Sequence, residues 1–70
     1  MLKLYSSKKV IKVLQKKGFI HISQKGSHVK FRKTGSPTLT VIVPVGRKEI
    51  PFGTFRSILR QADLSEEDFK

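Results

Sequence analysis

The chain has no cysteine, and its first 48 residues contain neither aspartate nor glutamate. The lack of cysteine excludes a disulfide framework and a zinc–thiolate site, and it fits a reducing compartment. The longest apolar stretches are far too short for a bilayer span or the core of a signal peptide. We therefore expect neither export nor membrane insertion.

The few acidic residues divide the chain by charge. Fifteen lysines and arginines stand against five acidic residues, which gives a formal net charge of +10. Residues 1–48 hold twelve of the basic residues and carry +12, whereas residues 49–70 carry −2. Such a surface attracts polyanions, because phosphate binding releases counterions. Nucleic acid is the expected partner; a merely soluble basic surface and an anionic membrane are the alternatives.

Clustered carboxylates, the usual ligands of hard cations such as Mg²⁺, are also missing from the sequence. Four of the five acids fall within the last eight residues, and Glu49 stands alone. A two-metal nuclease is therefore disfavoured, and we expect neither a metal nor a cofactor.

Apolar spacing predicts a helix at each end of a single domain that covers residues 1–70. Residues 6–17 show one apolar helical face, with Ser6 or Ser7 as N-cap and Gly18 as the C-terminal stop. Residues 55–62 repeat the pattern, and Thr54 is expected to cap that helix. A capped single turn is predicted at residues 65–68, held in place by Leu64 and Phe69.

The segment between the helices predicts three strands, at residues 19–24, 28–33 and 39–43. Short turns join them, so the sheet is an antiparallel meander. Each helix must bury its apolar stripe, and both therefore cover one face of the sheet. The expected fold is α+β, in the order α-β-β-β-α, with both helices on the same side of a three-stranded antiparallel sheet.

Alternation along the second strand makes His28 a candidate functional residue. Val29 and Phe31 point toward the helices, so His28, Lys30 and Arg32 stand on the open face, in water. His28 also follows the flexible Gly26-Ser27 turn, where a backbone can approach a ligand closely. His21 lacks this support and is interpreted as an ordinary surface or sheet-face residue.

An imidazole on a basic surface suits RNA cleavage, because RNA carries its own nucleophile. A base that removes the 2′-hydroxyl proton lets that oxygen attack the adjacent phosphate and expel the 5′-oxygen. Nearby cations stabilise the charge that builds on phosphorus. A Ser27-His28-acid triad is rejected, because neighbours along a strand point to opposite faces.

Four segments, taken together, resemble the HicA-type toxin family. They are Gly18-Phe19, Lys25-Gly26-Ser27-His28, residues 40–44 (TVIVP) and residues 48–62 (KEIPFGTFRSILRQA). The resemblance implies a fold like the double-stranded-RNA-binding domain and an mRNA interferase, with His28 as the essential residue. It also implies a HicB-type antitoxin as inhibitor and a location in the prokaryotic cytoplasm. Asp63 departs from the family pattern, because many relatives have glycine there, and Val45-Gly46 replaces a segment that is often polar.

The leading hypothesis is therefore a metal-independent endoribonuclease toxin that acts on mRNA. Lys30 and Arg32 are expected to bind phosphate, with Lys25 at the rim and Arg47 and Lys48 as further RNA contacts in a loop. The alternatives are a non-catalytic double-stranded-RNA-binding module and a structural subunit that binds an acidic protein. Whether His28 serves both proton-transfer steps, or Lys30 assists it, stays open.

Overall fold

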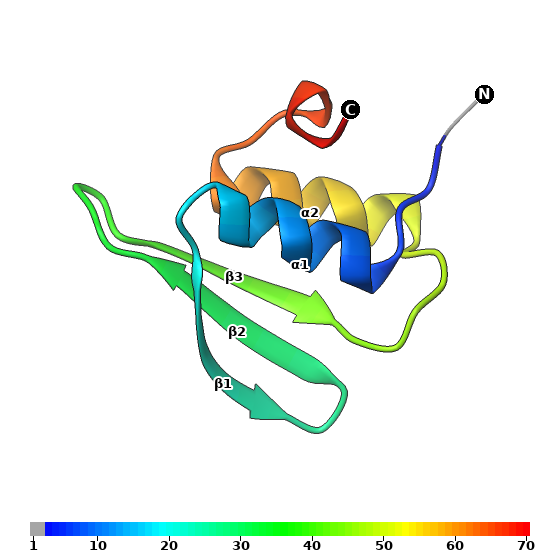
Figure 1. The fold of residues 1–70 in the computed structure, drawn as a ribbon, viewed down its shortest axis with the longest axis horizontal. Coiled ribbons are helices and arrows are strands. Elements are labelled where there is room, and N and C mark those ends of the chain that lie inside the picture. The colour runs from blue at the N-terminus through cyan, green and yellow to red at the C-terminus, as the bar shows by residue number, and fades with distance from the viewer. Residues whose placement is uncertain (1–2) are drawn as a thin grey trace.

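The structure, a computed structural model, describes residues 3–70, in which two helices, three strands and a final 3-10 turn follow one another (Figure 1). The elements are α1 (Ser7–Lys16), β1 (Ile20–Lys25), β2 (His28–Lys33), β3 (Leu39–Pro44), α2 (Phe52–Ala62) and η1 (Glu66–Phe69). The sheet is antiparallel with β2 in the middle, and α1 and α2 lie on one side of it. The predicted α+β fold and its element order are confirmed. Within residues 3–70, no helix is long and apolar enough to cross a membrane.

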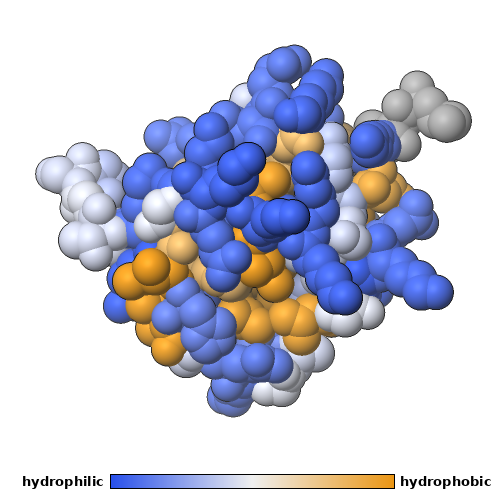
Figure 2. All heavy atoms as spheres, viewed as in Figure 1, coloured by the Kyte–Doolittle hydropathy of each residue, from blue (hydrophilic) through white to orange (hydrophobic). Residues whose placement is uncertain are grey.

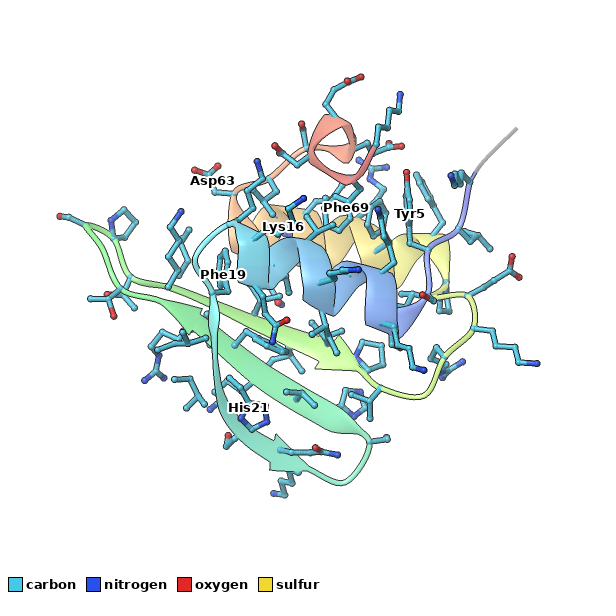
Figure 3. The ribbon with its side chains drawn as sticks, in the orientation of Figure 1. Tyr5, Lys16, Phe19, His21, Asp63 and Phe69 are labelled. Carbon is cyan, nitrogen blue, oxygen red and sulfur yellow. The ribbon has the colours of Figure 1, made fainter. Side chains whose placement is uncertain are left out.

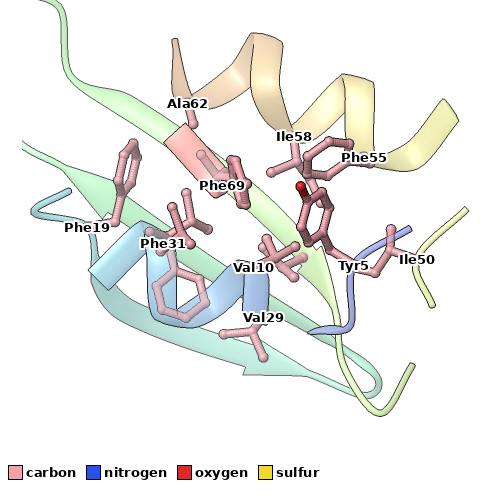
Figure 4. Close-up of a cluster of buried hydrophobic side chains, with 14 residues drawn as sticks. Tyr5, Val10, Phe19, Val29, Phe31, Ile50, Phe55, Ile58, Ala62 and Phe69 are labelled. Atoms are coloured by element: carbon pink, nitrogen blue, oxygen red, sulfur yellow. The ribbon is translucent and has the colours of Figure 1, made fainter. Parts of the chain in front are cut away.

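Apolar side chains from both helices meet those of β2 and β3 in one core (Figure 4). Val29 and Phe31 of β2 are buried there, as their alternation predicts. Phe69 of η1 closes the core, with its ring centroid 5.0 Å from that of Phe55 and 5.7 Å from that of Tyr5. Burying one such side chain contributes about 1.5–3 kcal/mol, so the short C-terminal turn is an integral part of the fold.

The helices cover only part of the sheet. Every residue of β1 is exposed, including Ile20 at 61% and Ile22 at 40%. The pairing of β1 with β2 also shifts by one residue between His21 and Ser23, so that Ile22 forms a bulge. The expectation that both helices cover one face is thus confirmed for β2 and β3, while β1 projects beyond the helix layer.

The starts of the two helices differ from each other. Ser6 caps α1, and its hydroxyl accepts a hydrogen bond from the Lys9 N–H at 3.1 Å. The prediction that Thr54 caps α2 is wrong, because that helix already begins at Phe52 after Pro51, with no side-chain cap. Pro51 has a fixed φ and no N–H of its own to satisfy, and its carbonyl accepts the first helical hydrogen bond from the Phe55 N–H at 2.9 Å.

Ser7 is a buried polar residue that ties α1 to the loop after β3. Its hydroxyl donates a hydrogen bond to the Pro44 carbonyl at 2.6 Å and accepts one from the Arg47 N–H at 3.1 Å. The Ser7 N–H also donates to the Arg47 carbonyl at 3.0 Å. This connection, here called the Ser7 bridge, holds the end of β3 and its loop against the helix.

Candidate functional site

The turn between β1 and β2 fixes where His28 stands. Gly26 takes a φ of +58°, a left-handed conformation that glycine adopts without steric strain. The Ser27 carbonyl then accepts a hydrogen bond of 2.8 Å from the Val45 N–H, beyond the end of β3. His28 is therefore the first residue of β2. It lies at a corner of the sheet, where the turn after β1 is hydrogen-bonded to the segment after β3.

The strand register brings three rows of side chains together on the open face, away from the helices. The rows, each read from β1 through β2 to β3, are Lys25-His28-Pro44, Ser23-Lys30-Ile42 and Ile20-Arg32-Thr40. The candidate residues Lys25, His28, Lys30 and Arg32 thus share one surface, here called the open face. His28, Lys30 and Arg32 lie on the side that the alternation predicts, and Lys25, expected in the turn, is the last residue of β1 beside His28.

Residues of the first two rows, other than Pro44, line a shallow hollow of about 490 Å³. It is lined by Ser23, Lys25, His28, Val29, Lys30 and Ile42. His28 is exposed, whereas Lys30 and Arg32 are half-buried rather than fully in water, because strands flank β2 on both sides. Arg32 turns toward β3, where its Nε lies 3.5 Å from the Thr40 hydroxyl, and it does not line the hollow.

Within residues 3–70, one side chain lies within hydrogen-bond distance of the His28 imidazole. The Ser27 hydroxyl lies 3.5 Å from Nδ1, which is at the outer limit of a hydrogen bond. No carboxylate in residues 3–70 forms a hydrogen bond or ion pair with this ring. The same residues contain no cluster of three histidine or acidic side chains able to hold a metal ion. The ring nitrogens are accordingly accessible to a ligand in the hollow.

Arg47 and Lys48 are exposed and lie apart from this hollow. They line a separate depression with Ser6, Ser7 and Lys8, at the N-terminal end of α1. The structure therefore does not bring these two candidates together with His28.

Figure 3 labels His21 on β1. By the strand register, His21 lies on the opposite side of the sheet from His28. It pairs with Phe31 across the strands, and the two rings meet edge to face with centroids 5.8 Å apart. The side chain is exposed, which agrees with its interpretation as a sheet-face residue.

Two residues that line the hollow, Ser23 and Ile42, were missed by the sequence reasoning. Ile42 lies two residues before Pro44 on β3, so strand alternation combined with the register could have found it. Ser23 reaches the open face only because of the bulge at Ile22. Plain alternation from His21 places Ser23 on the helix side.

The family model described as the HicA toxin of bacterial toxin–antitoxin systems matches residues 7–64. This chain belongs to the HicA toxin family. It is accordingly the toxin component of a toxin–antitoxin system. The matched segment runs from the start of α1 to just beyond α2 and includes every residue of the open face, whereas η1 of this HicA toxin lies outside it. A search of curated proteins finds no match.

Proposed function

We propose that this HicA toxin is an endoribonuclease that cleaves mRNA on the open face, with His28 as the proton-transfer residue. The observation that carries the proposal is the position of His28. Its exposed imidazole stands at the edge of an accessible hollow that Lys25 and Lys30 also line, and no carboxylate of residues 3–70 is bonded to it. An accessible base among phosphate-binding cations is the arrangement that cleavage by the 2′-hydroxyl requires.

In the proposed reaction, His28 removes the proton from a ribose 2′-hydroxyl. The 2′-oxygen forms a bond to the adjacent phosphorus, and the bond from phosphorus to the 5′-oxygen breaks. The leaving oxygen takes a proton from the imidazolium formed in the first step or from the Lys30 ammonium in the same hollow. The products are a 2′,3′-cyclic phosphate and a 5′-hydroxyl, and no step needs a metal or a cofactor.

The remaining basic candidates have supporting roles in this proposal. Lys25, Lys30 and Arg32 bind the phosphates that flank the cleaved bond, because the register places them on the surface that carries His28. Arg47 and Lys48 contact more distant phosphates, since they lie in their own depression. A HicB-type antitoxin inhibits the toxin by covering the open face, and the activity takes place in the prokaryotic cytoplasm.

The test compares the two histidines of the chain. Wild-type protein, His28→Ala and the matched control His21→Ala are each incubated with a defined transcript in excess chelator. We expect His28→Ala to lose 100- to 10,000-fold in cleavage rate, the usual size of a general acid–base contribution. We expect His21→Ala to retain activity, because that ring lies on the other side of the sheet.

Two outcomes would contradict the proposal at different levels. Cleavage that survives His28→Ala rules out the mechanism but leaves the nuclease class intact. A wild-type protein that retards RNA on a gel without cutting it supports a non-catalytic RNA-binding module instead.

A further inference from the structure

Most of the lysines of α1 stand at positions where their charge destabilises the helix. Lys8 and Lys9 occupy the first turn, where the helix dipole disfavours cations, and no acidic residue accompanies them. Lys12 follows Lys8 by four residues and Lys16 follows Lys12 by four, a spacing at which like charges repel. Only Lys16, in the last turn, is favoured by the helix dipole, so helix formation does not explain the other lysines, which points to a role outside the fold.

Several of these lysines converge on a hollow between α1 and η1. It measures about 380 Å³, and its lining comprises Lys9, Lys12, Lys16, Lys17 and Lys70, together with Val13 and Asp68. On this side of the molecule, hydrophilic side chains gather over α1 and η1 (Figure 2). We call this feature the lysine hollow.

Acidic neighbours neutralise only one edge of the lysine hollow. Lys17 pairs with Asp68 at 3.1 Å, and Lys70 pairs with Glu67 at 3.4 Å. Within residues 3–70, Lys9, Lys12 and Lys16 form no ion pair. Three neighbouring ammonium groups thus face solvent without a protein counter-charge, and a polyanion can supply one.

Basic side chains also connect the lysine hollow with the open face. Lys33, the last residue of β2, packs over Gly18, where its Cε lies 3.5 Å from the position of an added Cβ. Gly18 directly follows Lys17 of the lysine hollow. Lys33 is on the helix side of the sheet at the end of β2, and the preceding residue, Arg32, is on the open face.

We propose that the lysine hollow is a second RNA-binding site, which holds the phosphodiester backbone of single-stranded RNA outside the segment positioned at His28. This inference rests on the proposed function, because cleavage at His28 defines which segment is the substrate. Single-stranded RNA is the favoured ligand, since a flexible chain of phosphates can follow the curved path from α1 over Lys33 to β2.

The first test measures binding, in a His28→Ala background that prevents cleavage. The variant Lys12→Gln/Lys16→Gln is compared with Arg56→Gln/Arg60→Gln, which removes the same charge from two exposed positions, also four residues apart, on α2. The loss of two phosphate contacts reduces the slope of log K against log [salt] by about 1.4. This corresponds to an affinity about 25-fold lower at 0.1 M salt. We expect that loss for a 20-nucleotide RNA only with the α1 variant.

The second test measures cleavage, with His28 restored. We expect Lys12→Gln/Lys16→Gln to raise KM for a long transcript without changing kcat, and to leave a tetranucleotide unaffected. Equal losses in the α1 and α2 variants would show a general effect of net charge and overturn the proposal. Wild-type affinity in the α1 variant would overturn it as well.

The two tests separate failure of this inference from failure of the proposed function. If the wild-type protein cuts no RNA, the proposed function fails, and the binding comparison still decides the fate of the lysine hollow. Circular dichroism of both double variants checks that each one is folded. If the α1 variant instead loses affinity only for an acidic protein such as the antitoxin, the site is a protein interface and the proposal is wrong.

Discussion

Replacing Ser7 with alanine tests how strongly the Ser7 bridge stabilises the domain. The substitution removes a buried hydroxyl that donates to the Pro44 carbonyl at 2.6 Å and accepts from the Arg47 N–H at 3.1 Å. Alanine fits the space, so the loss is that of the hydrogen bonds rather than of packing. Each backbone group left buried without a partner costs about 1–3 kcal/mol. Water can solvate the Arg47 N–H in part, because that bond is only partly buried.

We therefore expect Ser7→Ala to lower the free energy of unfolding by about 2–3 kcal/mol. A domain of this size has a total stability of about 4–10 kcal/mol, so the loss is a large fraction of the whole. The melting temperature should fall by about 10–20 °C, measured by circular dichroism or calorimetry.

Ser6→Ala is the matched control, because it makes the same chemical change one residue earlier. It removes only the exposed cap bond to the Lys9 N–H, which is worth about 1 kcal/mol. If Ser7→Ala lowers the melting temperature no more than Ser6→Ala does, the Ser7 bridge is not the stabilising feature that its geometry indicates.

Two further substitutions test the C-terminal end of the domain. The Ser65 N–H and the Lys17 ammonium hold the pKa of the Asp68 carboxyl below its ordinary value. Its contribution to stability is therefore present at neutral pH and is lost as the pH falls through the lowered pKa. Asp68→Asn should reduce the melting temperature at pH 7 more than at about pH 3, and an equal reduction would contradict this linkage. Asp63 follows α2 as its C-cap with a φ of 57°, a conformation that glycine adopts without strain. Asp63→Gly should therefore raise the free energy of unfolding, measured by urea denaturation, by about 0.5–1 kcal/mol. A lower urea midpoint for the variant would show that the aspartate side chain compensates for its strained backbone.

Local patterns in the sequence were sufficient to predict the elements of this fold. The helical spacing of Phe55, Ile58 and Ala62 predicted a buried stripe, and these residues are buried. The alternation of β2 predicted which side of the sheet Val29 and Phe31 occupy. Such patterns work because burial imposes the period of the element directly on the sequence.

Features that depend on contacts between distant segments could not be predicted in this way. The exposure of β1 depends on how far the helix layer extends, which alternation along one strand does not encode. The bulge at Ile22 inverts the side on which Ser23 stands, so a lining residue of the hollow was missed. Ser7 looked like one of two equivalent caps, yet it is bonded to residues about 40 positions away.

The same long-range contacts explain how Val45, an apolar residue in the loop after β3, supports the open face through its backbone. Val45 and Gly46 carry no polar side chain that could form a hydrogen bond with RNA. The backbone supplies a different contribution, because the Val45 N–H holds the Ser27 carbonyl at 2.8 Å, next to His28. The Ser7 bridge in turn fixes Pro44 and Arg47 on either side of Val45 and Gly46. A buried hydroxyl on α1 thus restrains the position of His28 through the backbone of the loop, although its own partners lie outside the hollow.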